Sequence, residues 1–334
     1  MSDEPLVLRE SPTDGISALA WSPRESTLLA AASWDCFARL YDTSRDSVAA
    51  KYECPAPVLD VAWSADGGSL AAGGLDAAVR LFDVGSGAVR VLGAHGGPVR
   101  AVAAVPSLGA VASGGWDACV KLFDPRKPPG EALRIALPHR VYTMALAGSG
   151  AAAATLIVGT AERQIHFFDL RAAGAPAQRS RESSLKHQTR VLRAMPDGRG
   201  YIVGSIEGRC GVEYLADAEQ ARQKYAFKCH RVADPATPGE DRIFPVNAIA
   251  FHPLHGSFAT GGGDGGVCVW DFRNKKRLAK LRECDTSVSA LAFNLAGDRL
   301  AVASSYAWEQ GDRPHPPDQI QVRVVSEAEV KPKG

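Results

Sequence analysis

Basic residues gather between Arg179 and Arg231, and their types and spacing could bind a phosphate. This segment holds eleven Lys and Arg residues against six Asp and Glu residues, a local excess of five positive charges in a chain whose net charge is +1. Arginine offers paired N–H donors that match phosphate oxygens, and such charge-assisted bonds are strong. We predict that Arg190, Arg209 and Lys228 bind the phosphate of a phosphopeptide. The alternative interpretation is a solvated basic face.

Two tryptophans stand beside expected turns and could bind a partner chain. Trp34 directly precedes Asp35, and Trp116 directly precedes Asp117. An indole next to a surface turn is partly exposed, and aromatic residues are favoured anchors of protein interfaces. We predict that both tryptophans contact a partner segment. The alternative is that each indole packs over its own turn.

Signatures of catalysis are not found in the sequence. It contains no H-E-x-x-H, G-x-S-x-G or Walker motif. His252 and His255 flank a Pro-Leu pair without a nearby third ligand, so we expect a surface loop there and no metal site. The glycine-rich run 261–266 precedes an expected strand, which favours a hairpin turn over a phosphate loop. The sequence therefore indicates a binding platform with no catalytic residue, metal or cofactor.

The elements that position these residues are repeats of about 41 residues. The turn aspartates Asp35, Asp76 and Asp117 are each 41 residues apart, and Asp264 holds the same place in a later copy. Each copy combines apolar runs of four to six residues with Gly, Asp, Pro and Ser turns, a pattern typical of β-strands. A period near 41 that ends in an aromatic-Asp pair is typical of a WD40 blade. Seven copies predict an all-β, seven-bladed WD40 β-propeller.

The repeats depart from the WD40 consensus in two ways. Only Trp270-Asp271 spells the Trp-Asp pair, because the other copies use Tyr or Phe before Asp. The Gly-His pair is nearly absent, and Gly93-Ala-His95 is its nearest trace. We expect the turn aspartates to be structural, since a short carboxylate accepts backbone N–H bonds in a tight turn.

One domain should span residues 1–334, with a short C-terminal tail over 326–334. We expect residues of about 5–10 to form the outer strand of the seventh blade, which closes the ring and shields its edges. In a four-stranded blade, the end of the outer strand, the start of the next inner strand and the turn between the second and third strands share one rim. The basic residues and tryptophans singled out above should therefore share that rim.

Composition narrows the class of protein further. The chain has 334 residues, of which 46 % are hydrophobic and 22 % charged, so it can bury a large core. No apolar run approaches the roughly 18 residues that cross a bilayer, and the acidic start shows no secretory signal. Seven scattered cysteines without a C-x-x-C pair favour free thiols in a reducing compartment. A net charge of +1 gives no general attraction to membranes or nucleic acids, and we expect neither as a partner.

Four motifs closely resemble the spindle-assembly-checkpoint WD40 proteins of the "budding uninhibited by benzimidazole" group, namely its kinase-free propeller members. The resemblance spans essentially the whole chain. The motifs are Arg181-Glu-Ser-Ser-Leu-Lys-His-Gln-Thr-Arg190, Ser205-Ile-Glu-Gly-Arg209, Tyr225-Ala-Phe-Lys-Cys-His-Arg231 and Pro245-Val-Asn-Ala-Ile-Ala-Phe-His252.

This resemblance implies a non-enzymatic adaptor of the mitotic checkpoint. Such proteins bind the GLEBS segment of checkpoint kinases or kinase-like proteins and dock on phosphorylated Met-Glu-Leu-Thr repeats of a kinetochore scaffold. It also implies contact with the anaphase-promoting-complex activator and its inhibitory complex. The implied places are the nucleus and the mitotic kinetochore, with cytoplasm as well.

The resemblance also assigns roles to individual residues. The phosphate-binding residues of the family fall on Arg209 and Lys228, with Arg190 assisting. Its rim tryptophans fall on Trp34 and Trp116. The partner segment should further meet the residues Glu182 and Lys186.

Two other functions stay open at this stage. The sibling family of messenger-RNA-export adaptors at nuclear pores shares the fold and could use the same rim, with RNA on the basic stretch. A substrate receptor of a ubiquitin ligase is a common WD40 role that no motif here favours. Because phosphate-backbone binding falls steeply with salt, RNA capture at physiological salt separates the export function from the checkpoint function.

Overall fold

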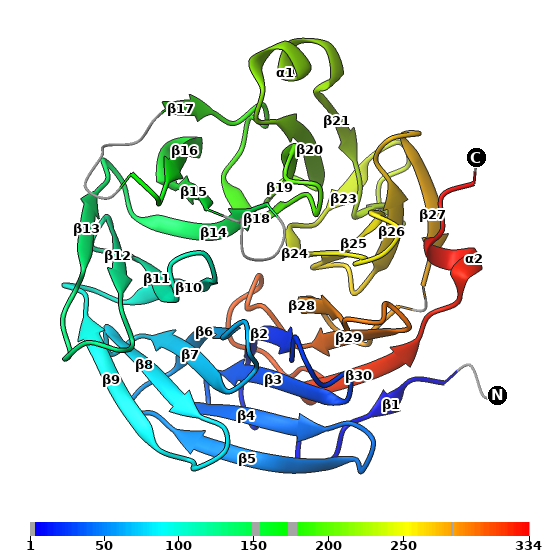
Figure 1. Cartoon of the computed structure of the whole chain (residues 1–334). Helices are drawn as coiled ribbons and strands as arrows, with labels where there is room; N and C mark the ends of the chain where they lie inside the picture. The colour runs from blue at the N-terminus through cyan, green and yellow to red at the C-terminus, as the bar shows by residue number, and fades with distance from the viewer. Residues whose placement is uncertain (1–3, 149–153, 173–178, 282, 334) are drawn as a thin grey trace.

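Each repeat folds into one four-stranded antiparallel sheet because its short apolar runs alternate with tight turns. The computed structural model describes the chain except for residues 1–3, 149–153, 173–178, 282 and 334. Seven such sheets are found in the described residues, arranged as the blades of a ring (Figure 1). The predicted all-β, seven-bladed WD40 propeller is thereby confirmed.

The first three blades follow one another along the chain with the inner strand first. Blade 1 consists of β2 (Ile16–Trp21), β3 (Leu28–Ser33), β4 (Phe37–Asp42) and β5 (Ser47–Glu53); blade 2 of β6 (Val58–Trp63), β7 (Ser69–Gly74), β8 (Ala78–Asp83) and β9 (Val89–Ala94); and blade 3 of β10 (Val99–Val105), β11 (Ala110–Gly115), β12 (Cys119–Phe123) and β13 (Leu133–Ala136).

The last four blades keep the same order, with the first segment of the chain completing the seventh. Blade 4 consists of β14 (Val141–Ala147), β15 (Thr155–Thr160), β16 (Gln164–Asp169) and β17 (Arg179–Glu182); blade 5 of β18 (Thr189–Ala194), β19 (Gly200–Ser205), β20 (Arg209–Tyr214) and β21 (Tyr225–Lys228); blade 6 of β24 (Val246–Phe251), β25 (Phe258–Gly262), β26 (Val267–Asp271) and β27 (Lys276–Lys280); and blade 7 of β28 (Val288–Phe293), β29 (Arg299–Ser304), β30 (Gln319–Val324) and β1 (Leu6–Val7).

A few short elements decorate the ring. A 3₁₀ turn (Ala161–Arg163) joins β15 to β16, and helix α1 (Asp217–Gln223) joins β20 to β21 at the edge of blade 5 (Figure 1). The β22–β23 hairpin, formed by Arg231–Ala233 and Asp241–Ile243, connects blades 5 and 6. In the expected tail, helix α2 (Glu327–Val330) contacts β26 and β27 and buries Val330. No helix in the described ranges is long and apolar enough to cross a membrane.

The first segment of the chain pairs with the last strand. Leu6 faces Val322 and Val7 faces Gln321 in an antiparallel register. The next residue, Leu8, donates its N–H to the carbonyl of Ile320 at 2.9 Å, and its side chain is buried in the core of blades 7 and 1. The blade-7 sheet therefore contains residues from both ends of the chain, which ties the two ends together.

Small residues and bridging indoles hold neighbouring blades together. Gly73 lies so close to blade 3 that an added Cβ would be 2.4 Å from the side chain of Val99, so a larger residue would push the blades apart. At the far ends of the inner strands, the Nε1–H of Trp21 donates to the carbonyl of Ala292 in blade 7 at 2.9 Å. Trp63 makes the equivalent bond to blade 1. These contacts join blade 2 to blade 3, blade 1 to blade 7 and blade 2 to blade 1.

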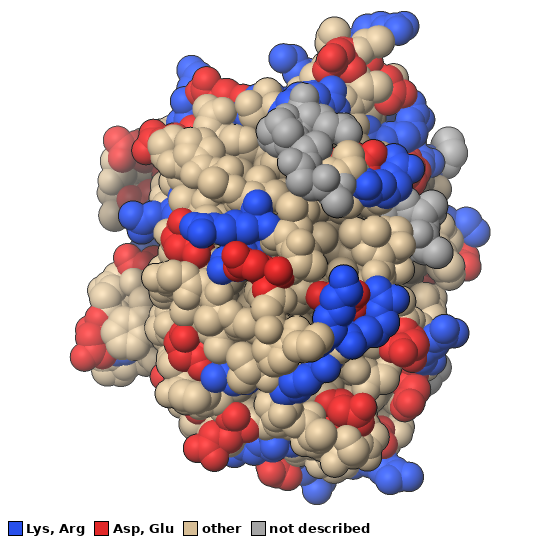
Figure 2. Space-filling model, turned by 60° about the vertical axis from the view of Figure 1, so that its left-hand side comes forward, with Lys and Arg blue, Asp and Glu red and all other residues tan. Residues whose placement is uncertain are grey.

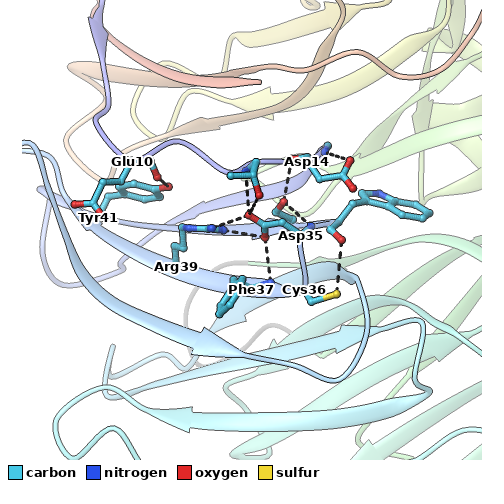
Figure 3. Close-up of polar contacts among 11 residues, drawn as sticks. Glu10, Asp14, Asp35, Cys36, Phe37, Arg39 and Tyr41 are labelled. Carbon is cyan, nitrogen blue, oxygen red and sulfur yellow. Dashed lines mark hydrogen bonds and ion pairs between the residues drawn. The ribbon is translucent and has the colours of Figure 1, made fainter. Parts of the chain in front are cut away.

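The turn aspartates accept hydrogen bonds from their own blades. Asp35 accepts the N–H of Phe37 at 3.1 Å and is paired with Arg39 at 2.6 Å, while the N–H of Thr13 reaches it from the preceding segment at 3.1 Å (Figure 3). Burial would raise the pKa of Asp35, but the bonds from Arg39 and Thr13 outweigh it and lower that pKa. These bonds match the structural role expected for the turn aspartates.

The histidine of the WD40 consensus occurs twice in the described blades, and the sequence interpretation found only one. His95 contacts Asp117 through Nδ1 at 2.9 Å and Ser113 through Nε2 at 2.7 Å. His230 contacts Asp264 in the same way at 2.8 Å. The second histidine was missed because the β22–β23 hairpin lengthens its spacing from Asp264 to 34 residues, against 22 for His95 and Asp117.

Two smaller expectations have different outcomes. All seven cysteines are free thiols, as predicted. The interpretation of residues 252–255 as a surface loop was wrong for His252, which is buried and contacts the carbonyl of Gly297 in blade 7 at 2.9 Å. Its ring stacks on that of His255.

Candidate functional site

The strand register brings the start of every inner strand and the turn between the second and third strands to one face. In blade 1, Ile16 faces Ser33 and Phe37 faces Glu53, so these four strand ends meet at the same edge of the sheet. The other blades repeat this pairing. We call the face formed by these edges, together with the loop 305–318 of blade 7, the top face.

A cavity of about 560 Å³ opens on the top face and is lined by residues of blades 1, 2, 3, 5, 6 and 7. Three residues singled out from the sequence line it, namely Trp34, Trp116 and Arg190. The two indoles are 43 % and 39 % exposed, so neither is packed away over its own turn. The cavity therefore offers aromatic walls to a ligand, which suits an apolar side chain of a bound peptide.

A third tryptophan completes the cavity, and the sequence interpretation missed it. Trp308 lies in the insertion of blade 7, lines the cavity and is 55 % exposed. Its loop is anchored because the Glu309 carboxylate accepts a bond from Ser287 at 3.2 Å and the ring of Tyr306 lies 6.2 Å from that of Trp308. A tryptophan within a proline-rich insertion of a late repeat was the available signal.

Arg190 belongs to this cavity by its position on the inner strand β18. Its Nε donates to Oδ1 of Asn247 at 3.2 Å, and Arg100 of blade 3 lines the same cavity. Burial lowers the pKa of Arg190, and the nearby charge of Arg100 lowers it further. Two guanidinium groups in this cavity favour an anionic group of the ligand.

Arg209 and Lys228 form a separate pair on the outer half of blade 5. They are register partners on β20 and β21, so their side chains extend from the same side of the sheet. The Nε of Arg209 lies 3.4 Å from Oε2 of Glu207, and the arginine side chain is 34 % exposed. Lys228 is exposed at the strand end, and within the described ranges no carboxylate lies at ion-pair distance from it.

The structure thus groups the predicted phosphate-binding residues differently from the sequence interpretation. Arg190 lines the cavity with the tryptophans, and Arg209 and Lys228 do not line it. The physical reason is the radial order of the strands, since β18 is the inner strand of blade 5 and β20 and β21 are its outer strands. Residues at the same rim therefore face different surroundings.

The remaining predicted residues lie on blade 4 and in the loop that follows it. Glu182 ends β17 and forms an ion pair with Arg163, which also donates to the carbonyl of Leu185 at 3.1 Å. Lys186 is exposed in the loop that joins blades 4 and 5. Glu182 is already partnered within its own blade, and Lys186 is open to a ligand.

Basic and acidic side chains are mixed on one side of the molecule. On the side that comes forward in Figure 2, basic and acidic side chains alternate and are separated by uncharged areas. That side offers no continuous basic surface of the kind that nucleic acids prefer. In the described part of the chain, no group of three or more His, Cys, Asp or Glu side chains is arranged to hold a metal ion.

Comparisons with known proteins place these features in context. The WD domain, G-beta repeat family matches residues 4–42, 48–83, 87–124 and 239–271. The chain is 45 % identical to mitotic checkpoint protein BUB3.1 of Arabidopsis thaliana, with 98 % of this chain and 94 % of that protein covered. It is 39 % identical to protein RAE1 of the same plant, with 97 % and 91 % covered. The structure of U3-55K has the same fold at a TM-score of 0.80 and 14 % identity, covering 96 % of this chain and 98 % of that one.

Proposed function

This chain belongs to the BUB3 family of mitotic checkpoint WD40 proteins, and we propose that it is a non-enzymatic adaptor that holds two peptides on its top face. One peptide is the GLEBS segment of a checkpoint kinase or kinase-like protein. The other is a phosphorylated Met-Glu-Leu-Thr repeat of a kinetochore scaffold. In this role it works at the kinetochore in the mitotic nucleus and also in the cytoplasm, and it joins the activator of the anaphase-promoting complex within the inhibitory complex.

The kinase segment binds in the cavity lined by Trp34, Trp116 and Trp308. These indoles are large and partly exposed, which are the properties of interface anchors. Arg190 and Arg100, which also line the cavity, bind acidic groups of the segment. Farther along the top face, the segment passes the Glu182–Arg163 pair and Lys186.

The phosphothreonine binds to Arg209 and Lys228, and this pair is the observation that carries the proposal. Both cations extend from one side of a sheet at its exposed edge, with no other residue between them across the β20–β21 ladder. Each charge-assisted hydrogen bond contributes about 1.5–3 kcal/mol. Two such bonds separate a phosphorylated from an unphosphorylated repeat by about 100-fold or more in affinity.

Calorimetry with phosphorylated and unphosphorylated repeat peptides tests this site. The Arg209→Glu/Lys228→Glu variant should lose at least about 100-fold in affinity for the phosphorylated peptide and leave the unphosphorylated one unchanged. The matched control is Arg126→Glu/Arg171→Glu, which reverses two exposed arginines that pair with aspartates outside the top face. Unaltered affinity in the first variant would contradict the proposal.

The kinase segment needs its own experiment because it uses a different part of the face. Trp34→Ala/Trp116→Ala should weaken a GLEBS peptide at least tenfold and leave the phosphopeptide affinity within about twofold. Equal loss of both peptides would show that the two sites are not separate.

Messenger-RNA export is the alternative function, and the RAE1 relationship is the observation behind it. An export adaptor would bind RNA on the basic stretch between Arg179 and Arg231. RNA capture that persists at physiological salt and is lost in Arg209→Glu/Lys228→Glu would favour that function. We expect no such capture, because that stretch pairs Arg179 and Arg199 with acidic side chains.

A further inference from the structure

We propose that Glu207 is a built-in competitor that occupies Arg209 until a phosphate displaces it. The inference rests on the proposed phosphopeptide site and adds a residue that sets its affinity. Glu207 lies in the turn between β19 and β20, two residues before Arg209. Its carboxylate lies at ion-pair distance from Arg209.

Two hydrogen bonds hold the backbone of Glu207 and keep its carboxylate near Arg209. Its N–H donates to Oγ of Ser205 at 3.2 Å. Its carbonyl accepts a bond from Nη2 of Arg231 at 2.9 Å, and the same nitrogen lies 3.2 Å from Oε1. Arg231 is therefore committed to this turn, and it holds one carboxylate oxygen in place.

The second carboxylate oxygen, Oε2, contacts Arg209 and a histidine. It lies 3.4 Å from Nε of Arg209 and 3.5 Å from Nε2 of His187. Burial tends to raise the pKa of Glu207, but Arg209, Arg231 and His187 outweigh it and hold that pKa below its usual value. The group is ionised at neutral pH and is the one acidic side chain paired with Arg209 in the described structure.

The charges around the turn show why this competition matters. Arg209, Arg231 and Lys228 carry three positive charges, and Glu207 removes one. A phosphate carries about −1.5 to −2 at neutral pH, so it can replace the single charge of a carboxylate at Arg209. A neutral threonine cannot. Glu207 therefore makes phosphopeptide binding weaker and more readily reversible, and it has little effect on a peptide that carries no phosphate.

The test compares Glu207→Gln with the wild type by calorimetry, using the same phosphorylated and unphosphorylated repeat peptides. The variant should bind the phosphorylated peptide about three- to tenfold more tightly, since one like charge near the ligand is removed. Affinity for the unphosphorylated peptide should stay within twofold. The matched control is Glu219→Gln on α1, whose carboxylate pairs with Arg199, and it should bind like the wild type.

Each outcome decides between two roles for Glu207. Suppose that the Glu207→Gln variant melts at the wild-type temperature. Unchanged or weaker binding of the phosphorylated peptide would then overturn the inference, and Glu207 would instead help to position Arg209 for binding. If the variant melts lower, Glu207→Asp repeats the test, because its shorter carboxylate withdraws from Arg209 and should give a smaller gain. A wild type that does not distinguish the two peptides would instead refute the phosphopeptide site itself.

Discussion

Replacing Thr260 by Val tests the hydrogen-bonded network that positions the blade-6 turn. Its hydroxyl accepts the Nε1–H of Trp270 at 2.9 Å and contacts Nε2 of His230 at 2.9 Å. Since Nδ1 of His230 faces the Asp264 carboxylate, that nitrogen carries the proton and Nε2 accepts from the threonine. Valine keeps the shape but leaves two partners unsatisfied, each at a cost of about 1–3 kcal/mol. The variant should therefore lose about 2–6 kcal/mol of unfolding free energy.

Urea unfolding followed by circular dichroism measures this loss. Thr260→Ser keeps the hydroxyl and should cost only about 1 kcal/mol for the lost methyl group. In blade 3, Ser113→Ala removes one partner of His95 and should cost about 1–3 kcal/mol, less than Thr260→Val. If Thr260→Val is no more destabilising than Ser113→Ala, the network does not stabilise blade 6 as argued.

Two further predictions concern the whole ring. Deleting residues 1–9 should lower the melting temperature by at least about 5 °C in a thermal scan, because it removes β1 and buried Leu8 from blade 7; a melting temperature within 1 °C of the intact chain would contradict this. Unfolding free energy should also fall as pH drops from about 7 to 5, because unfolded histidines with a pKa near 6.5 take up protons that the buried ones do not. Burial lowers the pKa of His95, His166 and His252 in the folded chain. An unfolding free energy that does not change between pH 7 and 5 in urea titrations would contradict the lowered pKa values of those histidines.

Much of the fold could be predicted because each repeat shows the same local sequence pattern of short apolar runs and turn residues. Apolar alternation and turn residues specify each sheet, and the 41-residue spacing specifies the order of the sheets. The same logic placed Trp34 and Trp116 at a shared face, since equivalent turns of different blades share a rim. The signal failed where an insertion changed the spacing, as it did for His230 and Trp308.

Side-chain surroundings were harder to predict than blade positions. Arg190 and Arg209 both lie at the top of blade 5, and the sequence gives no measure of how far each is from the axis of the ring. That distance depends on which strand of the finished sheet carries each residue. Likewise, nothing in the spacing of Glu207 indicates that its carboxylate meets Arg209, Arg231 and His187 together.

The radial order of blade 5 also bears on the proposal that one face holds two ligands at once. Neighbouring strands of a sheet lie about 4.8 Å apart, so β18 is about 10 Å from β20 and about 14 Å from β21. Arg190 at the cavity and Lys228 at the edge are thus separated by more than the Debye length of about 8 Å at physiological salt. An acidic group at Arg190 therefore repels a phosphate at Lys228 only weakly, and the same rigid sheet positions both. Binding of one peptide should leave the affinity for the other nearly unchanged, as the proposed role of an adaptor between a kinase and a scaffold requires.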